Sequence, residues 1–220
     1  MNQSEQELLV TGASHLGVKL DTVAVECFST YLTLLQQWGK KINLTTRLEA
    51  REVVLYHFLD SLAGVPMFAG SATARVVDLG AGAGLPSLPL KFALPGLRVL
   101  LAESVRKKVA FCQEVIRTAG VTGIEALWGR GEDLGIKPEH HRAFDWAVSR
   151  ALGSSADVVK LALPFLAPGG RVLLYKGEPD SGELQALDAF CAEKRGSWEL
   201  RTVAIPHLTG ARSLIIVTFS

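Results

Sequence analysis

Apolar residues in the first third of the chain recur at steps of three and four, which is the spacing of one face of a helix. The clearest run follows Asp21, a favourable N-cap, and stops at Gly39, a favourable helix end. The predicted helices cover residues 5–16, 21–38 and 52–62. The tract 68–74 is small and polar, so we place a boundary there and expect a helical N-terminal region over residues 1–72.

The pattern changes at residue 75 to short, continuous apolar runs that are separated by helical ones. Strands of this kind are buried on both faces, which favours a parallel sheet covered by helices. The predicted strands are 75–80, 98–103, 124–128, 145–149 and 171–176. The predicted helices between and after them are 86–92, 106–119, a short one near Glu132, 155–166 and 182–194.

Two further apolar runs follow, at residues 198–205 and 213–219. The loop between them is too short for a parallel crossover, so they must pair as an antiparallel hairpin. A five-stranded wound sheet that ends in such a hairpin is the layout of Rossmann-like methyltransferases, and it differs from the all-parallel dinucleotide-binding fold. We therefore predict an α/β domain of this kind over residues 73–220.

Composition limits the partners and the compartment. With 48% hydrophobic and 20% charged residues, the 220-residue chain is expected to be a soluble globular protein. The formal net charge of +1 gives no overall attraction to nucleic acid or membranes, so a nucleic-acid partner must meet a local patch. Neither a membrane span nor a secretory signal is predicted. Three widely spaced cysteines, Cys27, Cys112 and Cys191, are expected to be buried thiols, which favours the reducing cytoplasm.

The first predicted strand carries Asp78 near its end and then breaks into three glycines at alternate positions, Gly80, Gly82 and Gly84. Glycine permits positive φ and lets a ligand approach the backbone closely, so we interpret this stretch as a strand-to-helix turn at a ligand site. The second strand ends about twenty residues later in Glu103. On Rossmann-like sheets, an acid at this place holds the ribose hydroxyls of a nucleoside-containing cofactor.

The spacing of the turn favours a cofactor without phosphate. A dinucleotide fingerprint needs a third glycine where Leu85 stands, and Pro86 and Pro89 remove two amide donors that a pyrophosphate would use. S-adenosylmethionine has a cationic sulfonium, a ribose and an adenine, and no phosphate. Asp78 is placed to face the sulfonium or the amino group, directly or through water; alternatively it caps the turn. Glu103 would hold the ribose, and its alternative is an exposed strand end.

Eight segments that span nearly the whole chain form a recognisable set: residues 38–45, 57–62, 77–86, 103–111, 129–133, 149–151, 174–177 and 212–215. In these segments the chain resembles the 16S ribosomal RNA guanine-N7 methyltransferases, also called glucose-inhibited division protein B. The resemblance implies a class I S-adenosylmethionine-dependent methyltransferase that modifies N7 of a guanine in small-subunit rRNA. Ser87 and Gly131 depart from the family, which usually has glycine and alanine at these places.

Carried over position by position, the resemblance implies a cofactor site at the glycine turn and at the ends of the following strands. The implied contacts are Gly80, Leu85, Glu103, Ser104, Val105, Gly131, Glu132 and Arg150, to which the turn itself adds Asp78, Gly82 and Gly84. Gly131 and Glu132 would lie beside the adenine, and Arg150 would close the site at the fourth strand. Neither departure from the family removes a side chain that the chemistry needs.

Guanine N7 has an available lone pair and carries no proton, so its methylation needs orientation and charge compensation rather than a general base. The residues after the fourth strand agree with this, because Ser149, Arg150 and Ala151 stand where amine methyltransferases have an Asn/Asp-Pro-Pro-aromatic motif. Arg150 is the candidate catalytic residue, which would hydrogen-bond the guanine or the cofactor carboxylate. Its alternative is an ion pair with Asp145 or Asp157.

Basic residues concentrate in the second part of the chain. Residues 1–74 carry five Lys/Arg and seven Asp/Glu, whereas residues 75–220 carry eighteen and fifteen. Such groups bind phosphates without reading sequence, and the alternative is ordinary solvated charge. The candidate RNA contacts are Arg106, Lys107, Lys108, Arg130 and Arg212, with a second patch of Lys40, Lys41, Arg47 and Arg51.

The histidines are not expected to be catalytic. His57 with Asp60 is interpreted as a structural hydrogen bond, and His140 and His141 are expected to be exposed. No metal site is predicted. We expect a cytoplasmic monomer that uses S-adenosylmethionine to methylate 16S rRNA, either naked or in an assembling small ribosomal subunit. The alternatives are a methyltransferase of the same fold with another RNA, protein or small-molecule substrate, and a ribosome-assembly protein without turnover.

Overall fold

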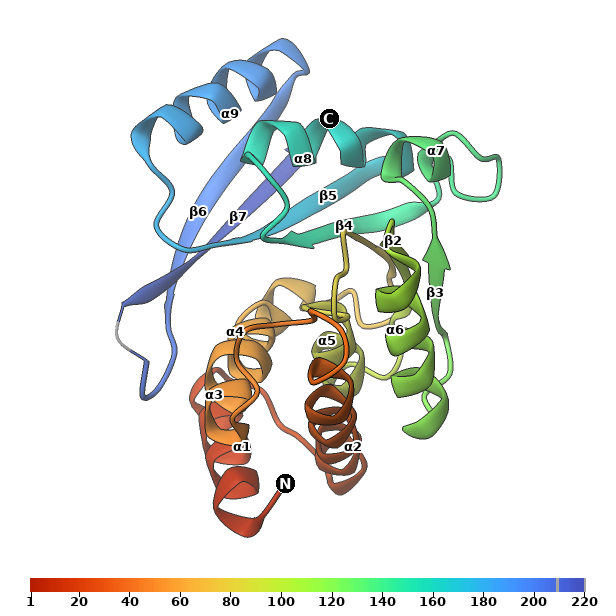
Figure 1. Ribbon diagram of the computed structural model, residues 1–220. Coiled ribbons are helices and arrows are strands. Elements are labelled where there is room, and N and C mark those ends of the chain that lie inside the picture. Colours follow the sequence, from red (N-terminus) through yellow and green to blue (C-terminus); the bar gives the residue numbers. More distant parts are fainter. Residues whose placement is uncertain (209, 220) are drawn as a thin grey trace.

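Among the residues that the computed structural model describes, 1–208 and 210–219, seven strands form one mixed sheet (Figure 1). They are β1 (Arg75–Leu79), β2 (Arg98–Glu103), β3 (Ile124–Trp128), β4 (Phe144–Arg150), β5 (Leu166–Lys176), β6 (Gly196–Ala204) and β7 (Ala211–Phe219). Their order across the sheet is β3-β2-β1-β4-β5-β7-β6. The first five are parallel, and β7 is antiparallel to both β5 and β6, so the predicted wound sheet with a closing hairpin is confirmed.

Helices cover both faces of this sheet (Figure 1). One face carries α1 (Gln3–His15), α2 (Thr22–Gly39), α3 (Ala50–Val53), α4 (Asp60–Leu62), α5 (Ser87–Ala93) and α6 (Arg106–Thr118). The other face carries α7 (Gly131–Gly135), α8 (Ser155–Ala162) and α9 (Ser181–Glu193). A π-helical turn η1 (Val54–Leu59) joins α3 to α4, and two 3-10 turns are η2 (Val65–Phe68) and η3 (Leu163–Phe165).

Alternate residues of the central strands enter two hydrophobic clusters, one on each face of the sheet. Val76 belongs to the larger cluster, with the N-terminal helices, α5 and α6, and Val77 belongs to the smaller one, with α7, α8 and α9. Buried rings from the N-terminal helices, Phe28 and Phe58 among them, are part of the larger cluster. The helical region and the sheet therefore share a core, and a domain boundary at residue 72 stays a prediction.

Three elements differ from the sequence-based expectation. The single helix expected over 52–62 is broken in the middle by the π-helical turn η1. Strand β5 begins at Leu166 rather than at 171, because Leu166 pairs with Phe144 ahead of a register shift. Helix α8 ends at Ala162, just before the 3-10 turn that contains Pro164. In the described part of the chain, no helix has the length and apolarity needed to cross a membrane.

Candidate functional site

The glycine turn and Glu103 lie together where β1 and β2 end. Glu103 is only 6% exposed. One of its carboxylate oxygens accepts a hydrogen bond from the Gly82 N–H at 2.8 Å, and the other accepts from the Val105 N–H at 2.8 Å. Each oxygen keeps lone-pair capacity for a further donor. The acid is thus held rigidly beside the turn, as the adjacent carboxyl ends of parallel strands predict.

The turn itself is partly covered. Gly80 and Gly82 keep exposed surface, whereas Gly84 and Leu85 are buried. All three glycines have positive φ, between 60° and 85°. A Cβ added at Gly82 would meet nothing closer than 3.8 Å, so the space beside this residue is open. Gly82 is therefore the position of the turn at which a ligand can approach the backbone most closely.

Asp78 lies beneath the turn and has no exposed surface. One carboxylate oxygen accepts from the Ser87 N–H at 3.3 Å, and the other has no hydrogen-bond partner among the described residues. Burial raises the pKa of Asp78 to about 7, although the Ser87 amide and Arg150 oppose this rise. The contact with Ser87 matches the predicted alternative of a turn cap. Direct contact with a sulfonium is not open to Asp78 in this conformation.

The other predicted cofactor residues line the neighbouring edge. Ser104, Val105 and Glu132 are exposed, and Gly131 begins α7. A cavity of about 360 Å³ lies next to them and is lined by Ser104, Trp128, Gly129, Arg130, Asp133, Leu134 and Lys137. Sequence reasoning missed Trp128, a residue that is 53% exposed. Its indole N–H donates to the Ser104 carbonyl at 2.9 Å, and the Arg106 guanidinium lies 4.0 Å from the ring centroid.

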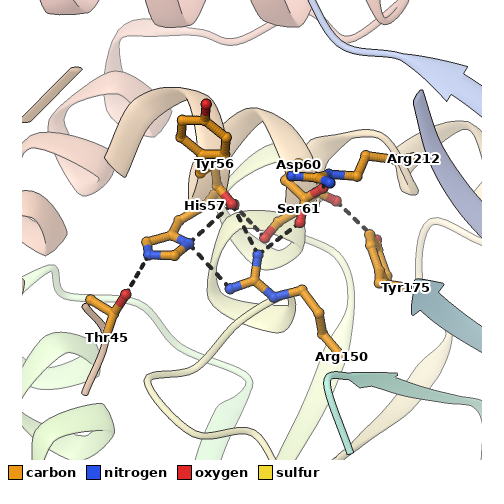
Figure 2. A network of polar contacts seen from close by, with 8 residues as sticks. All are labelled: Thr45, Tyr56, His57, Asp60, Ser61, Arg150, Tyr175 and Arg212. Atoms are coloured by element: carbon orange, nitrogen blue, oxygen red, sulfur yellow. Dashed lines mark hydrogen bonds and ion pairs between the residues drawn. The ribbon is translucent and has the colours of Figure 1, made fainter. Parts of the chain in front are cut away.

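A second cavity, of about 500 Å³, opens at the ends of β4 and β5. Its lining residues are Arg47, Tyr56, His57, Asp60, Arg150, Ala151, Tyr175, Lys176, Gly177 and Arg212. Figure 2 shows how the polar groups of this cavity converge on Asp60 and Arg150. Its lining carries four cations and one carboxylate; Arg47 and Lys176 are paired with Glu52 and Glu183, and Arg150 and Arg212 share Asp60, so one positive charge is left uncompensated. The cavity therefore suits an electron-rich or anionic ligand.

Arg150 forms an ion pair, but the partner is not one of the two expected carboxylates. Its NH1 donates to Asp60 Oδ2 at 2.8 Å (Figure 2). Asp145 instead accepts from the Arg75 backbone N–H, at 2.8 Å. Asp157 is hydrogen-bonded to Ser154, at 2.6 Å. The expected pairs with Asp145 or Asp157 are therefore wrong, because both aspartates are occupied by nearer donors.

His57 does not pair with Asp60, which corrects a second expectation. Its Nε2 lies 2.7 Å from Thr45 Oγ1, and its Nδ1 lies 3.0 Å from the Tyr56 carbonyl and 3.4 Å from Arg150 NH2 (Figure 2). Burial, and then the charge of Arg150, lower the pKa of His57 to about 4. The imidazole is therefore neutral near pH 7, and it adds no charge to the cavity.

The predicted RNA contacts fall into two groups. Arg106, Lys107, Lys108 and Arg130 lie at the start of α6 and just after β3, on the side of the 360 Å³ cavity. Arg212 lies apart from them in the second cavity, where its Nε donates to Asp60 Oδ1 at 2.7 Å. Of the second predicted patch, Arg47 reaches that cavity too, paired with Glu52 at 2.7 Å and lying over the Tyr56 ring.

The remaining titratable residues add no further site. His140 is buried beside the Phe144 ring, which corrects the expectation that it is exposed, and His141 is exposed as expected. All three cysteines are buried, as predicted. Within residues 1–208 and 210–219, no group of three His, Cys, Asp or Glu side chains is placed to hold a metal ion.

Comparisons with known proteins point to one family. The family model described as rRNA small subunit methyltransferase G matches residues 24–213. Ribosomal RNA small subunit methyltransferase G of Geobacter sp. (strain M21) is 36% identical over 218 residues, which cover 99% of each chain. The protein of the same name from Deinococcus deserti is 37% identical over 99% of this chain and 89% of its own. The O-methyltransferase TomG from Streptomyces achromogenes, solved in complex with S-adenosylmethionine, has a TM-score of 0.60 at 18% identity, over 100% of this chain and 99% of that one.

Proposed function

Because the chain belongs to the rRNA small subunit methyltransferase G family, we propose that it transfers the methyl group of S-adenosylmethionine to N7 of a guanine in 16S rRNA. Its sheet is that of class I methyltransferases. The family match does not favour the alternatives of a non-catalytic assembly protein or another substrate class. The proposed placement of the site rests on Glu103, which hydrogen bonds from the Gly82 and Val105 amides hold at the glycine turn.

The residues at the turn fit the cofactor. When bound, S-adenosylmethionine supplies an electrophilic methyl group on a sulfonium. The spare lone pairs of Glu103 suit the two ribose hydroxyls, and the open space at Gly82 lets the cofactor lie against the backbone. The unpartnered oxygen of Asp78 lies beneath the same turn, where a cation bound above it would favour the ionised carboxylate. Ser104 and Val105 remain proposed cofactor contacts after the second strand, and Gly131 and Glu132 remain the proposed contacts of the adenine.

The 500 Å³ cavity is the proposed place of the target guanosine. Arginine commonly binds guanine through O6 and N7 together, but N7 must stay free for methylation. The guanidinium groups of Arg150 and Arg212 are therefore proposed to bind O6 or a neighbouring phosphate. In the reaction an N7–CH3 bond forms while the S–CH3 bond breaks, and no proton leaves N7. The chain's own contribution is orientation and electrostatic compensation, in agreement with a neutral His57 and no general base.

The proposed RNA path joins this cavity to Arg106, Lys107, Lys108 and Arg130 on the other side of the cofactor site. These cations would bind phosphates, so the affinity for RNA should fall steeply with salt. We also propose that the enzyme acts as a cytoplasmic monomer, with naked 16S rRNA or an assembling small subunit as its substrate.

The proposed function is tested by mass spectrometry of nucleosides. Unmodified 16S rRNA, free or in small subunits, is incubated with the enzyme and S-adenosylmethionine and is then digested. We expect 7-methylguanosine to form in proportion to enzyme and to be absent when the cofactor is left out. Methylation at another atom, or cofactor binding in calorimetry without any methylated nucleoside, contradicts the proposal.

A further inference from the structure

Asp60 is the group on which the second cavity converges. Its side chain is only 9% exposed, yet it binds two cations, Arg150 at 2.8 Å and Arg212 at 2.7 Å, one on each carboxylate oxygen. The three residues come from distant parts of the chain: α4, the end of β4, and β7. One buried carboxylate thus fixes two guanidinium groups at the second cavity and neutralises one of their two positive charges (Figure 2).

Hydrogen bonds to backbone carbonyls next to Asp60 fix Arg150 and the residue that follows Asp60. The π-helical turn η1 brings the Tyr56 carbonyl to 3.3 Å from Arg150 NH1, which adds a second acceptor for that guanidinium. The Tyr175 hydroxyl donates to the Ser61 carbonyl at 2.9 Å, and the Ser61 hydroxyl donates to the His57 carbonyl at 2.6 Å. π-Helical turns are often found at functional sites. Here the turn sets Asp60 and the Tyr56 carbonyl, which both accept from Arg150 NH1, on one side of Arg150.

The two arginines differ in the donors that they keep for a ligand. Arg150 uses NH1 for Asp60 and Tyr56, while its NH2 lies toward His57. Arg212 binds Asp60 through Nε, and neither of its terminal nitrogens has a hydrogen-bond partner among the described residues. Since Arg212 lines the cavity, its terminal N–H groups form a preoriented fork for an oxygen ligand. Without Asp60, this long side chain would have to be ordered by the ligand itself, at a cost in entropy.

We propose that Asp60 is a positioning residue, which holds Arg150 and Arg212 against the target guanosine and cancels one of their two positive charges. This inference rests on the proposed function, and it names the residue that organises the nucleotide side of that site. The charge is as important as the geometry, because methylation at N7 places a positive charge on the base. Two unpaired guanidinium groups would repel that charge, whereas the pair with Asp60 carries a net charge of only +1.

The test compares Asp60→Ala and Asp60→Asn with a matched control, Asp145→Asn, another carboxylate that accepts a hydrogen bond but lies at the opposite ends of the strands. We expect Asp60→Ala to lower kcat/KM for rRNA by about 10- to 100-fold and Asp60→Asn to lower it less, because asparagine keeps one acceptor oxygen. The dissociation constant of S-adenosylmethionine, measured by calorimetry, should change by a much smaller factor than kcat/KM, since the contacts of Glu103 are untouched and Arg150 is the one expected cofactor contact that Asp60 holds. Asp145→Asn should resemble the wild type in both measurements.

A double-mutant cycle separates positioning from a general loss of structure. If Asp60 acts partly through Arg212, the combined loss in kcat/KM of Asp60→Ala with Arg212→Ala should be clearly smaller than the product of the two single losses, with the effect through Arg150 remaining. Independent, multiplying losses would overturn the proposal, as would equal losses of rRNA turnover and cofactor affinity. If Asp60→Ala does not fold, Asp60→Asn carries the same cycle. If the wild type makes no 7-methylguanosine, the proposed function fails, and filter binding of 16S rRNA to the same variants still decides whether Asp60 organises the RNA contact.

Discussion

At the scale of single residues, Glu103 contributes to folding through its two backbone hydrogen bonds and is also the proposed ligand of the ribose. Replacing it by alanine would leave the Gly82 and Val105 amides without their acceptors, so both folding and binding would change. Glu103→Gln keeps one acceptor oxygen and is the sharper test. We expect this variant to bind S-adenosylmethionine about 10-fold or more weakly, because a charge-assisted hydrogen bond is lost, and to lose only about 1 kcal/mol of stability.

Calorimetry with the cofactor and urea unfolding measure these two effects of Glu103→Gln. Glu125→Gln is the matched control, since Glu125 is an exposed acid in the neighbouring strand β3 and lies outside the proposed site. An unchanged dissociation constant in Glu103→Gln would remove Glu103 from the ribose.

Asp78 should make stability depend on pH in an unusual direction. Its pKa is about 7 in the fold, where burial favours the neutral acid, and near 3.8 when unfolded. Between these values the folded state binds more protons at this carboxyl than the unfolded state does, so its contribution to stability falls as the pH rises. Asp78→Asn avoids this loss. We expect the free energy of unfolding of the variant, measured relative to that of the wild type, to rise by about 2 to 4 kcal/mol from pH 5 to pH 8.

Urea unfolding of both proteins at the two pH values measures this gain for Asp78→Asn. The opposite effect of His57, whose pKa is lowered to about 4, is common to both proteins and cancels in the comparison. A difference between the two proteins that does not change with pH would show that the Asp78 carboxylate stays ionised.

At the scale of elements, the glycine turn separates into a structural and a ligand-facing part. A Cβ at Gly84 would lie 2.3 Å from Leu88, inside the core, whereas a Cβ at Gly82 would enter open space. Both residues have positive φ, which costs a non-glycine residue about 1 to 2 kcal/mol. We expect Gly84→Ala to destabilise the protein by clearly more than this. Gly82→Ala should lower the free energy of unfolding by only about that cost, but it should weaken cofactor binding.

Thermal unfolding and calorimetry on the two glycine variants distinguish these roles. Equal losses of stability in both, with equal cofactor affinity, would contradict the placement of the ligand at Gly82.

The sequence alone predicts the strands better than it predicts the π-helical turn or the side-chain contacts between distant elements. Continuous apolar runs identified the parallel strands, and the spacing between the glycine turn and Glu103 assigned both to one ligand site; the structure brings them into contact because the carboxyl ends of β1 and β2 are adjacent. The ion pairs of Asp60 could not be predicted, because its partners lie 90 and 152 residues away and polar side chains carry no periodic signal of their contacts. The π-helical turn was missed because its apolar spacing over 54–59 resembles that of an ordinary helix. The burial of His140 depends on a ring contact with Phe144 that a polar loop sequence does not reveal.

At the scale of the whole molecule, the N-terminal helices contact the proposed cofactor site as well as the core. Tyr31 of α2 is fully buried, and its hydroxyl donates to the Ala83 carbonyl of the glycine turn at 2.6 Å. Its ring lies 5.3 Å from that of Phe58 and 6.0 Å from that of Phe111. The turn is therefore supported by a residue from outside the predicted domain of residues 73–220.

A fragment of residues 73–220 tests the predicted domain division. We expect it not to fold cooperatively, because removal of the helices exposes the larger hydrophobic cluster and leaves the Ala83 carbonyl without its donor. Circular dichroism and urea unfolding of the fragment, beside the complete chain, measure this. A cooperative transition with cofactor affinity intact would show instead that the sheet domain is autonomous.

Arg212 reaches the second cavity from the end of the β6–β7 hairpin, apart from the glycine turn. Strand β7 pairs with β5 from Ser213 onward, so Arg212 lies just beyond that pairing and is held in the sheet by Val203 of the edge strand β6. Local fraying of the hairpin at this end would withdraw an arginine of the proposed guanosine cavity while the contacts of Glu103 stay intact. On gradual warming, such an enzyme would lose its proposed rRNA methylation while it still retained its methyl donor.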